Sequence, residues 1–308
     1  MQHRRQLAPG YLSSAYAESL AEFGRPRELA KCGGWILERK IPGTDLHDAM
    51  GCYPLFACRE WKNLQEDCEA LSREVVALSV VTDPFGNYDQ SVLENVFKDV
   101  VRPFKSHFVA DLRQSRDSLV SKHHRYYARR ALNNVVVEIC KSPDEIFEDW
   151  MALYSCLAQR HHLKGMKAFS RASFAKQLRV PGITILRALE NRTTIGAHLW
   201  FTHGDAALSH LAATNARGYE LMASYALYWS ALAYFAERVR WIDWGAGAGL
   251  DGNEADGLTE FKRGWANETR MTFFCGRIFD VSAYQRLCQN NPATRSGYFP
   301  AYRAGEFD

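Results

Sequence analysis

The sequence of 308 residues lacks the long apolar run that a membrane-spanning helix requires. Its apolar segment from Tyr219 to Phe235 contains Ser224 and the charged Glu220, and polar residues lie on both sides. Because a spanning helix needs about 20 mostly apolar residues, we expect a helix buried in a protein core and no membrane span. The first residues, MQHRRQLAPGYLSS, carry positive charges but no apolar segment behind them. We therefore expect no signal peptide and a cytoplasmic protein.

A strong excess of one charge is also absent. Lys and Arg number 38 against 35 Asp and Glu, and the formal net charge is +3 with a pI near 8.4. A nucleic-acid partner is indicated by a concentrated basic face, which this balance does not provide. The 47% hydrophobic and 24% charged residues are typical of a globular protein with one large or two ordinary domains.

The eight cysteines include no CxxC pair, which disfavours a zinc site or a disulfide framework. With no export signal, we expect them to be reduced and partly buried small residues. They are scattered along the chain at Cys32, Cys52, Cys58, Cys68, Cys140, Cys156, Cys275 and Cys288.

The first half of the chain alternates between strand and helix patterns, which predicts an α/β layer arrangement. Residues 1–34, punctuated by proline and glycine, resemble an arm with one helix near Leu12 to Phe23. The patterns that follow predict a short strand at Pro54 to Cys58, a helix at Trp61 to Leu71, a strand at Val75 to Val81, a helix at Gln90 to Val100 and a strand at Ser106 to Leu112.

A basic stretch, Ser121 to Leu132, separates the two halves. Its arginines and tyrosines suit a contact with phosphate or RNA, whereas a solvated linker helix with inward tyrosines is the simpler interpretation. The adjacent His123 and His124 would diverge by roughly 100° on a helix and form a poor metal pair. We expect no metal site.

The second half predicts the element order β-α-α-β-β-β-α-β-α-β. The elements are Val135 to Cys140, Pro143 to Arg160, Arg171 to Leu178, Ile183 to Leu189, Thr194 to Phe201, Ala207 to Ala213, Tyr219 to Phe235, Val239 to Trp244, Ala255 to Trp265 and Arg270 to Ile278. The polar turn Asn215 to Gly218 leads into the apolar helix, whose free N–H groups could hold an anion.

This order is similar to that of the GNAT N-acyltransferase superfamily. Four pieces resemble the C-terminal half of FemAB-like acyl and aminoacyl transferases, namely RALENRTTIGAHLWF, HLAATNARGYELMASYALYWSAL, WIDWGAGAG and DGLTEFKRGW. The most specific is the Phe-Lys-Arg-Gly-Trp element at residues 261–265. The resemblance covers about residues 125–280 and implies an α/β fold with a mixed sheet and tandem GNAT-like modules. After an arm at 1–34, a degenerate module at 35–120 precedes a complete one at 121–308.

In acyl-CoA enzymes of this superfamily the pyrophosphate lies on a loop of the type Gln/Arg-x-x-Gly-x-Gly/Ala. Here the corresponding cofactor-binding candidates are Asn215, Ala216, Arg217, Gly218 and Tyr219. The turn has one glycine of that pattern, and Glu220 would repel a pyrophosphate. This departure favours Fem-type members, which use aminoacyl-tRNA. The absence of an obvious charged helical-hairpin insertion, which many Fem-type enzymes carry, argues the other way.

Four residues are candidates for catalysis. By the resemblance, Lys262 lies in the active centre, where a cation would stabilise a tetrahedral oxyanion or a donor phosphate or carboxyl group. His210 could accept a proton from an amine, or be a core histidine. Tyr225 could supply a proton to a leaving group, or only pack. Asp243 could organise an amine or a neighbouring loop, or cap a turn.

The sequence therefore predicts an N-acyltransferase that moves an acyl group from acyl-CoA or an acyl carrier protein to an amine. The acceptor could be a small amine, an amino sugar or a peptide. A Fem-type ligase that uses charged tRNA is the first alternative. The run Asp243-x-Gly245-x-Gly247-x-Gly249 imitates a methyltransferase motif for S-adenosylmethionine, but most of the sheet precedes it. A non-catalytic scaffold on the same fold is the last alternative.

Overall fold

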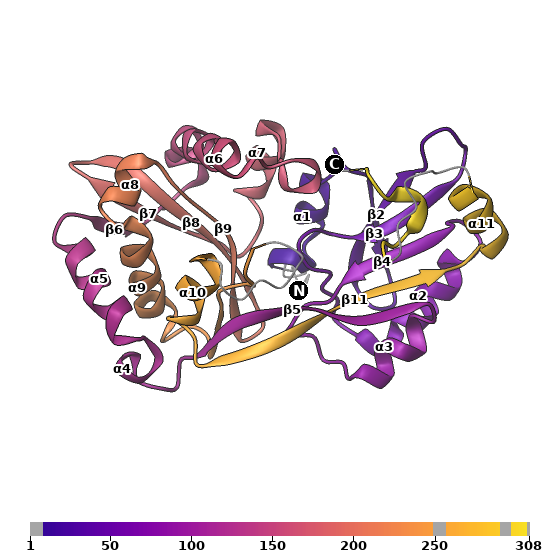
Figure 1. The fold of residues 1–308 in the computed structure, drawn as a ribbon, viewed down its shortest axis with the longest axis horizontal. Helices are drawn as coiled ribbons and strands as arrows, with labels where there is room; N and C mark the ends of the chain where they lie inside the picture. Colours follow the sequence, from indigo (N-terminus) through magenta and orange to yellow (C-terminus); the bar gives the residue numbers. More distant parts are fainter. Residues whose placement is uncertain (1–8, 249–256, 290–296, 307–308) are drawn as a thin grey trace, which may run out of the picture. The chain divides into compact units, whose positions relative to one another are not determined.

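A computed structural model describes residues 9–248, 257–289 and 297–306 (Figure 1). The chain forms two compact units, each assembled from separate stretches. Unit 1 comprises Met1–Phe104, Lys164–Gln177 and Thr272–Asp308, and unit 2 comprises Lys105–Leu163 and Leu178–Met271. The three domains expected from the sequence, 1–34, 35–120 and 121–308, are each one continuous stretch. Their bounds therefore differ from those of the two units, which combine separate stretches.

Unit 1 has a mixed sheet. Its strands are β1 (Arg25–Leu29), β2 (Gly34–Lys40), β3 (His47–Gly51), β4 (Ala77–Val81) and the end of β11 (Glu268–Ile278), in the order β1-β2-β3-β4-β11. Only the β3–β4 pair is parallel. The sequence analysis gave no strand for β2 or β3, and the strand expected at Pro54 to Cys58 is a single bridge between Phe56 and Thr82.

Short helices accompany this sheet. They are α1 (Ser14–Ser19), α2 (Leu64–Leu71), α3 (Gln90–Val96), α7 (Arg171–Gln177) and α11 (Val281–Gln289), with single 3-10 turns at Gly10–Leu12, Trp61–Asn63, Gly165–Lys167 and Ala301–Arg303. The segment expected to be an arm is packed into the unit, because Tyr16 and Leu20 are fully buried. Asp89 starts α3 by accepting the N–H of Val92 at 2.9 Å.

The strands of unit 2 also pair in a mixed arrangement, in the order β5-β10-β9-β8-β7-β6. The strands are β5 (Val100–Asp111), β10 (Trp241–Asp243), β9 (Ala206–Thr214), β8 (Thr193–His203), β7 (Ile183–Glu190) and β6 (Val136–Ile139). Only the β10–β9 pair is parallel. The helices are α4 (Arg116–Leu119), α5 (Lys122–Leu132), α6 (Phe147–His161), α8 (Ala216–Glu220), α9 (Ala223–Phe235) and α10 (Gly257–Arg263), with a 3-10 turn at Pro143–Glu145.

The predicted element order is confirmed from β6 to β11. The helix expected at Tyr219 to Phe235 is divided, because Met222 has a left-handed backbone with φ 57° between α8 and α9. α9 is buried on most sides, and with α5 it covers one face of the sheet, whereas α6 covers the other (Figure 1). None of the helices in the described ranges is long and apolar enough to cross a membrane.

The cysteines are free thiols, as the sequence predicts. Five are buried, at Cys32, Cys52, Cys58, Cys68 and Cys275. Burial raises the pKa of Cys52 and of Cys68 to about 12, so both are neutral at pH 7. They act as small packing residues.

Candidate functional site

Residues 245–248 form the loop after β10, which we call the glycine loop. Side chains of β10, α10 and β5 form hydrogen bonds with its backbone. Asp243 Oδ1 accepts the N–H of Gly245 at 2.7 Å. The Nζ of Lys262 on α10 donates to the carbonyl oxygen of Ala246 at 2.6 Å, and the Nζ of Lys105 on β5 donates to that of Gly247 at 3.3 Å. Two cations therefore fix the path of this loop.

Gly245 permits the contact with Lys262. Its φ is +78°, a backbone conformation that favours glycine. A Cβ at this position would lie 3.0 Å from Lys262 Nζ. The glycine is therefore required both for the turn and for the approach of the ammonium group.

The Phe-Lys-Arg-Gly-Trp element positions Lys262 through its two aromatic residues. The ring of Phe261 packs edge-on against Tyr228, with ring centroids 4.8 Å apart. Trp265 is fully buried, and its carbonyl oxygen accepts the indole N–H of Trp244 at 2.9 Å. Lys262 thus lies between two anchors, and it is half-buried.

A histidine of the basic stretch completes this anchorage. His124 on α5 is buried, and its Nε2 donates to the carbonyl oxygen of Phe261 at 2.9 Å. The Oγ of Ser121 is 2.8 Å from Nδ1 of the same ring. A Cβ on Gly264 would lie 2.1 Å from the ring, which explains the glycine of the element. His124 is therefore a positioning residue, a role that was not expected from the sequence of the basic stretch.

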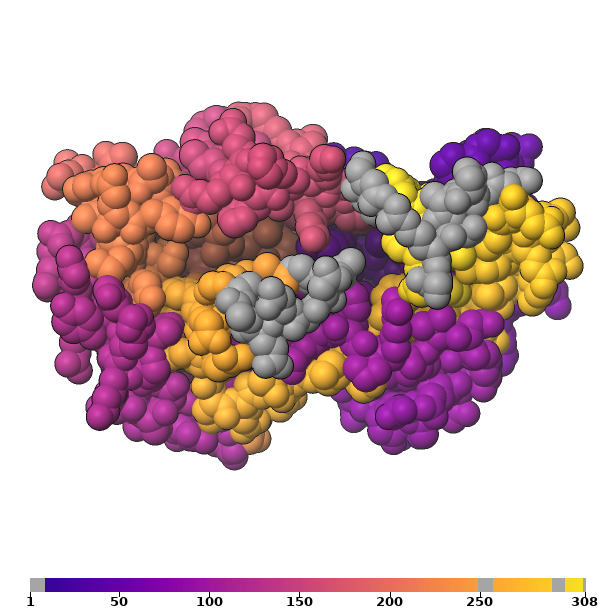
Figure 2. All heavy atoms as spheres, viewed as in Figure 1, coloured from indigo at the N-terminus to yellow at the C-terminus, as the bar shows by residue number. Residues whose placement is uncertain are grey.

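The remainder of α5 lies at the surface of unit 2 (Figure 2). Lys122, Tyr126, Arg129 and Arg130 are exposed, and Tyr126 is 60% exposed. The expectation of inward tyrosines holds in part, since Tyr127 is half-buried and its ring is 5.3 Å from that of Tyr225. The basic stretch is a helix of the unit with one buried and one solvated face.

A second buried histidine, His198 on β8, was not selected from the sequence. Its ring lies 4.2 Å from Trp200 and 5.0 Å from Tyr228, and its Nε2 is 2.7 Å from Ser209 Oγ. Burial and, second, the charge of Lys262 lower the pKa of His198 well below its usual value. Its Nδ1 has no hydrogen-bond partner among the described residues. The only signal in the sequence is a histidine within an apolar strand.

His210 lies on the other face of the sheet. It is the extra residue of a β-bulge, because Leu211 pairs with Leu199 and Ser209 with Trp200. Its ring is 4.7 Å from Phe201, which follows Trp200 and therefore points to the opposite face. Burial lowers the pKa of His210 to about 3. The structure thus separates His210 from His198 and Tyr228.

Asp243 is paired with His107 on β5. Its Oδ2 lies 2.8 Å from His107 Nδ1, and the carboxylate is buried. The same side chain accepts the N–H of Gly245, so Asp243 links β5 to the start of the glycine loop. Sequence reasoning selected Asp243 for organising a loop but gave no signal for His107.

Two tyrosines of α9, Tyr225 and Tyr228, have different surroundings. Tyr225 contacts the rings of His124 and Phe261 at 5.2 and 5.0 Å, and burial together with Tyr127 raises its pKa. Tyr228 stacks on Trp244 at 4.6 Å and lies beside His198, and burial raises its pKa. Both hydroxyls are therefore protonated at pH 7, and Tyr228 is the one next to His198.

In the turn Asn215 to Gly218, the candidate pyrophosphate site, the polar side chains already bind groups of the protein itself. Asn215 Oδ1 accepts the N–H of Gly218 at 2.9 Å, and a Cβ on Gly218 would meet the carbonyl oxygen of Ile195 at 2.3 Å. Arg217 is paired with Glu190 and with Glu220, which raises the pKa of its guanidinium.

The other two residues of this turn are exposed. Ala216 starts α8, a helix of five residues, and Tyr219 is 52% exposed beneath the guanidinium of Arg160 at 3.9 Å. α9 begins only after Met222. The turn therefore forms the start of one short helix, α8, and does not lead directly into α9, so it offers no cradle at the start of α9.

Comparison with known proteins agrees with this geometry. Residues 118–263 match the family model of the acetyltransferase (GNAT) domain. A crystal structure of FemX is 12% identical with a TM-score of 0.66, covering 89% of this chain and 93% of the FemX chain. No curated protein sequence matches the chain significantly.

Two further solved structures have the same fold. One is the C-terminal domain of a protein assigned as a lysylphosphatidylglycerol synthetase from Agrobacterium fabrum, with 14% identity, a TM-score of 0.58 and 90% of each chain covered. The other is L-PGS from Bacillus licheniformis, with 13% identity, a TM-score of 0.57 and coverage of 89% of this chain and 94% of that one.

Residues 118–263 of unit 2 therefore match a GNAT-type acetyltransferase domain, and the chain has a fold similar to that of FemX. The domain match and the shared fold confirm the resemblance to FemAB-like GNAT proteins that the sequence indicates. The predicted α/β fold with a mixed sheet is also confirmed. Among the described residues, no group of three or more His, Cys, Asp or Glu side chains could hold a metal ion.

Proposed function

We propose that unit 2 transfers an acyl or aminoacyl group to an amine, with Lys262 as the charged group of the centre. The observation that carries this proposal is the half-buried Lys262 ammonium, 2.6 Å from the carbonyl oxygen of Ala246 on the glycine loop. Attack of an amine on an ester or thioester forms a tetrahedral oxyanion. A fixed cation near that oxygen contributes about 3 kcal/mol to lowering the barrier.

His198 supports this role of Lys262. Because burial lowers its pKa, the imidazole is neutral at pH 7 and does not compete with the positive charge of Lys262. The same low pKa makes His198 a poor general base near neutral pH. We therefore assign it to positioning and to shaping the electrostatic field, beside Tyr228.

The donor we favour is an aminoacyl ester of tRNA. Two glutamates hold Arg217, and α8 separates the turn from α9, which argues against a pyrophosphate clamp for coenzyme A at residues 215–219. A thioester of coenzyme A or of an acyl carrier protein is the second candidate. The observation in its favour is the match to an acetyltransferase domain. The proposed acceptor is an amine on a small molecule, an amino sugar or a peptide.

The test is a transfer assay with labelled donors. The purified chain is mixed with acetyl-CoA, longer acyl-CoAs or charged tRNA and with a panel of amines, and a thermal-shift series adds S-adenosylmethionine. We expect transfer from one donor class and a loss of about 10² to 10³ in kcat for Lys262→Met. The matched control is Arg263→Gln, an exposed change on the same helix, which retains activity.

Three results would count against the proposal. Full turnover by folded Lys262→Met would remove Lys262 from the centre. Stabilisation by S-adenosylmethionine alone would favour a methyltransferase. Absence of binding to every donor, together with no effect of Lys262→Met, would favour a scaffold.

A further inference from the structure

A pocket of about 760 Å³ opens in unit 1, between the end of α1, the strand β2 and the C-terminal segment. It is lined by both signs of charge, with more basic than acidic side chains. The basic ones are Arg25, Arg39, Lys40, His47 and Arg303. The volume suits a small molecule, and all of the lining belongs to unit 1.

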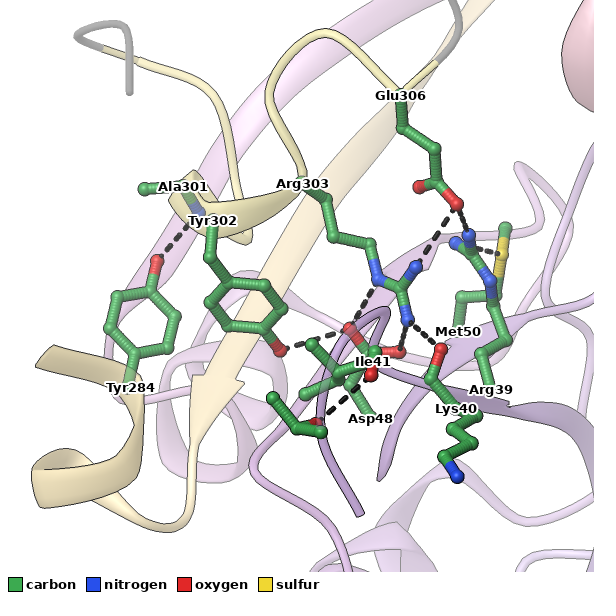
Figure 3. A network of polar contacts seen from close by, with 11 residues as sticks. Arg39, Lys40, Ile41, Asp48, Met50, Tyr284, Ala301, Tyr302, Arg303 and Glu306 are labelled. Atoms are coloured by element: carbon green, nitrogen blue, oxygen red, sulfur yellow. Dashed lines mark hydrogen bonds and ion pairs between the residues drawn. The ribbon is translucent and has the colours of Figure 1, made fainter. Parts of the chain in front are cut away.

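One wall of the pocket is a rigid arginine site (Figure 3). Arg303 is 5% exposed, and its Nε and Nη2 donate to the two oxygens of Asp48 at 2.6 and 2.8 Å. The hydroxyl of Tyr302 donates to the same carboxylate at 2.9 Å, and Nη2 of Arg303 also reaches the carbonyl oxygen of Lys40 at 3.1 Å. This network fixes the guanidinium in one orientation.

The remaining Nη1 of Arg303 points at Glu306, which it contacts at 3.0 Å. Arg39 of β2 binds the same oxygen of Glu306 through Nη2, and its Nη1 donates to Met50 Sδ at 3.4 Å (Figure 3). Two arginine side chains with exposed fractions of 12% and 4% thus converge on one carboxylate oxygen. Asp48 neutralises one of them, and Glu306 neutralises the other.

Glu306 differs from the other members in its place on the chain. It follows the last 3-10 turn, Ala301–Arg303, and the residue is exposed, although its side chain reaches inward. Its departure would break the contacts with Arg39 and Arg303 but leave the Asp48–Arg303 network intact. Two guanidinium groups beside the pocket would then each lose a carboxylate contact, which favours an incoming anion in that position.

We propose that this pocket binds a small molecule through a carboxylate group, and that Glu306 occupies the carboxylate position until the ligand displaces it. A planar carboxylate matches the forked donors of two arginines. The apolar Phe23 and Pro42 line the same pocket and can contact the rest of the ligand. The site is independent of the transfer reaction in unit 2, since it shares no residue with it.

The test uses glutarate as the probe and its neutral diamide, glutaramide, as the matched control. In calorimetric titrations we expect Glu306→Ala to bind glutarate at least tenfold more tightly than the unaltered chain, and no variant to bind glutaramide. Arg39→Gln in the Glu306→Ala background should abolish glutarate binding. Equal affinity of Glu306→Ala and the unaltered chain, or retention of binding after Arg39→Gln, overturns the proposal.

Three further arms keep the test decisive. Glu306→Lys also removes the internal carboxylate and adds a cation while every arginine is retained, so it should likewise bind glutarate at least tenfold more tightly than the unaltered chain; this arm covers the case of an unfolded Arg39 variant, and weaker binding would overturn the proposal. Binding of inorganic phosphate without glutarate would overturn the assignment to a carboxylate. Lys262→Met should leave glutarate binding unchanged, so failure of this site and failure of the transfer reaction are distinguishable.

Discussion

The Nε2 atom of His124 donates to the carbonyl oxygen of Phe261 at 2.9 Å, one residue before Lys262. The contact joins α5 to α10, and Ser121 binds the other ring nitrogen. The buried imidazole of His124 is therefore hydrogen-bonded to both the carbonyl oxygen of Phe261 and the hydroxyl of Ser121. Because Phe261 precedes Lys262, the position of Lys262 depends on this ring.

Replacing His124 by leucine should lower the free energy of unfolding by about 2 kcal/mol, because it removes two hydrogen bonds and leaves a buried carbonyl oxygen without its donor. Transfer activity should fall as well, since α10 loses an anchor. Urea unfolding measures the first effect. The control is His123→Ala on the exposed side of α5, for which we expect a change within about 0.5 kcal/mol. Equal losses for the two variants would contradict the assignment.

Gly264→Ala should destabilise the protein by about 2 kcal/mol. The new methyl group would lie 2.1 Å from the ring of His124, so the ring or the helix must move. Gly257→Ala, at the other end of α10, is the matched control because its Cβ would meet no atom of the described residues within 4 Å. Thermal unfolding of both variants checks the prediction, and a Gly264→Ala protein as stable as Gly257→Ala would refute it.

The resemblance and the periodic patterns predicted much of the second half of the chain, including β6 to β11. They did so because long amphipathic or alternating runs carry a strong local signal. The break at Met222 was missed because one left-handed residue inside an apolar run leaves no pattern. β2 and β3 were missed because their mixed burial obscures alternation.

The site was predicted less completely than the fold. Lys262 was selected because the Phe-Lys-x-x-Trp element is distinctive. His107 contacts Asp243, which lies 136 positions later in the chain, and His124 contacts Phe261, which lies 137 positions later. Pairing of strands and packing of helices create such contacts, so no local spacing reveals them. His198 was missed for the same reason.

The low pKa of His210 predicts a loss of stability in acid. Its folded-state pKa of about 3 lies below the usual 6.5, so the unfolded chain binds a proton first as the pH falls. Stability is unaffected above about pH 7 and is lost as the pH falls from 6.5 toward 3. Between pH 7 and pH 5 this histidine contributes roughly 2 kcal/mol of that loss.

Urea unfolding of His210→Gln at pH 7 and pH 5 tests this contribution. The variant should lose roughly 2 kcal/mol less than the unaltered chain over that interval. His123→Gln, which changes an exposed histidine, should retain the full loss. An unchanged pH dependence in His210→Gln would show that the imidazole is not held neutral by burial.

The buried pair of Asp243 and His107 should be energetically coupled. Asp243→Asn retains an acceptor for the N–H of Gly245 but removes the charge beside His107, and His107→Gln removes the ring. In a double-mutant cycle we expect a coupling of about 1 to 2 kcal/mol. Additive losses would mean that the two side chains are neighbours without a favourable interaction.

Arg217 decides between the two classes of donor. In the structure its guanidinium is held by Glu190 and Glu220, and such exposed ion pairs contribute little to stability because solvent screens them. If the donor is aminoacyl-tRNA and residues 215–219 do not hold a pyrophosphate, Arg217→Gln should change the KM for the donor less than twofold. If coenzyme A is the donor and its pyrophosphate displaces the glutamates, the KM should rise about tenfold, which corresponds to one charge-assisted hydrogen bond of about 1.4 kcal/mol. Steady-state kinetics with the donor found in the transfer assay separates the two outcomes. Glu190→Gln, which removes one of the two carboxylates on Arg217, should lower the KM only in the second.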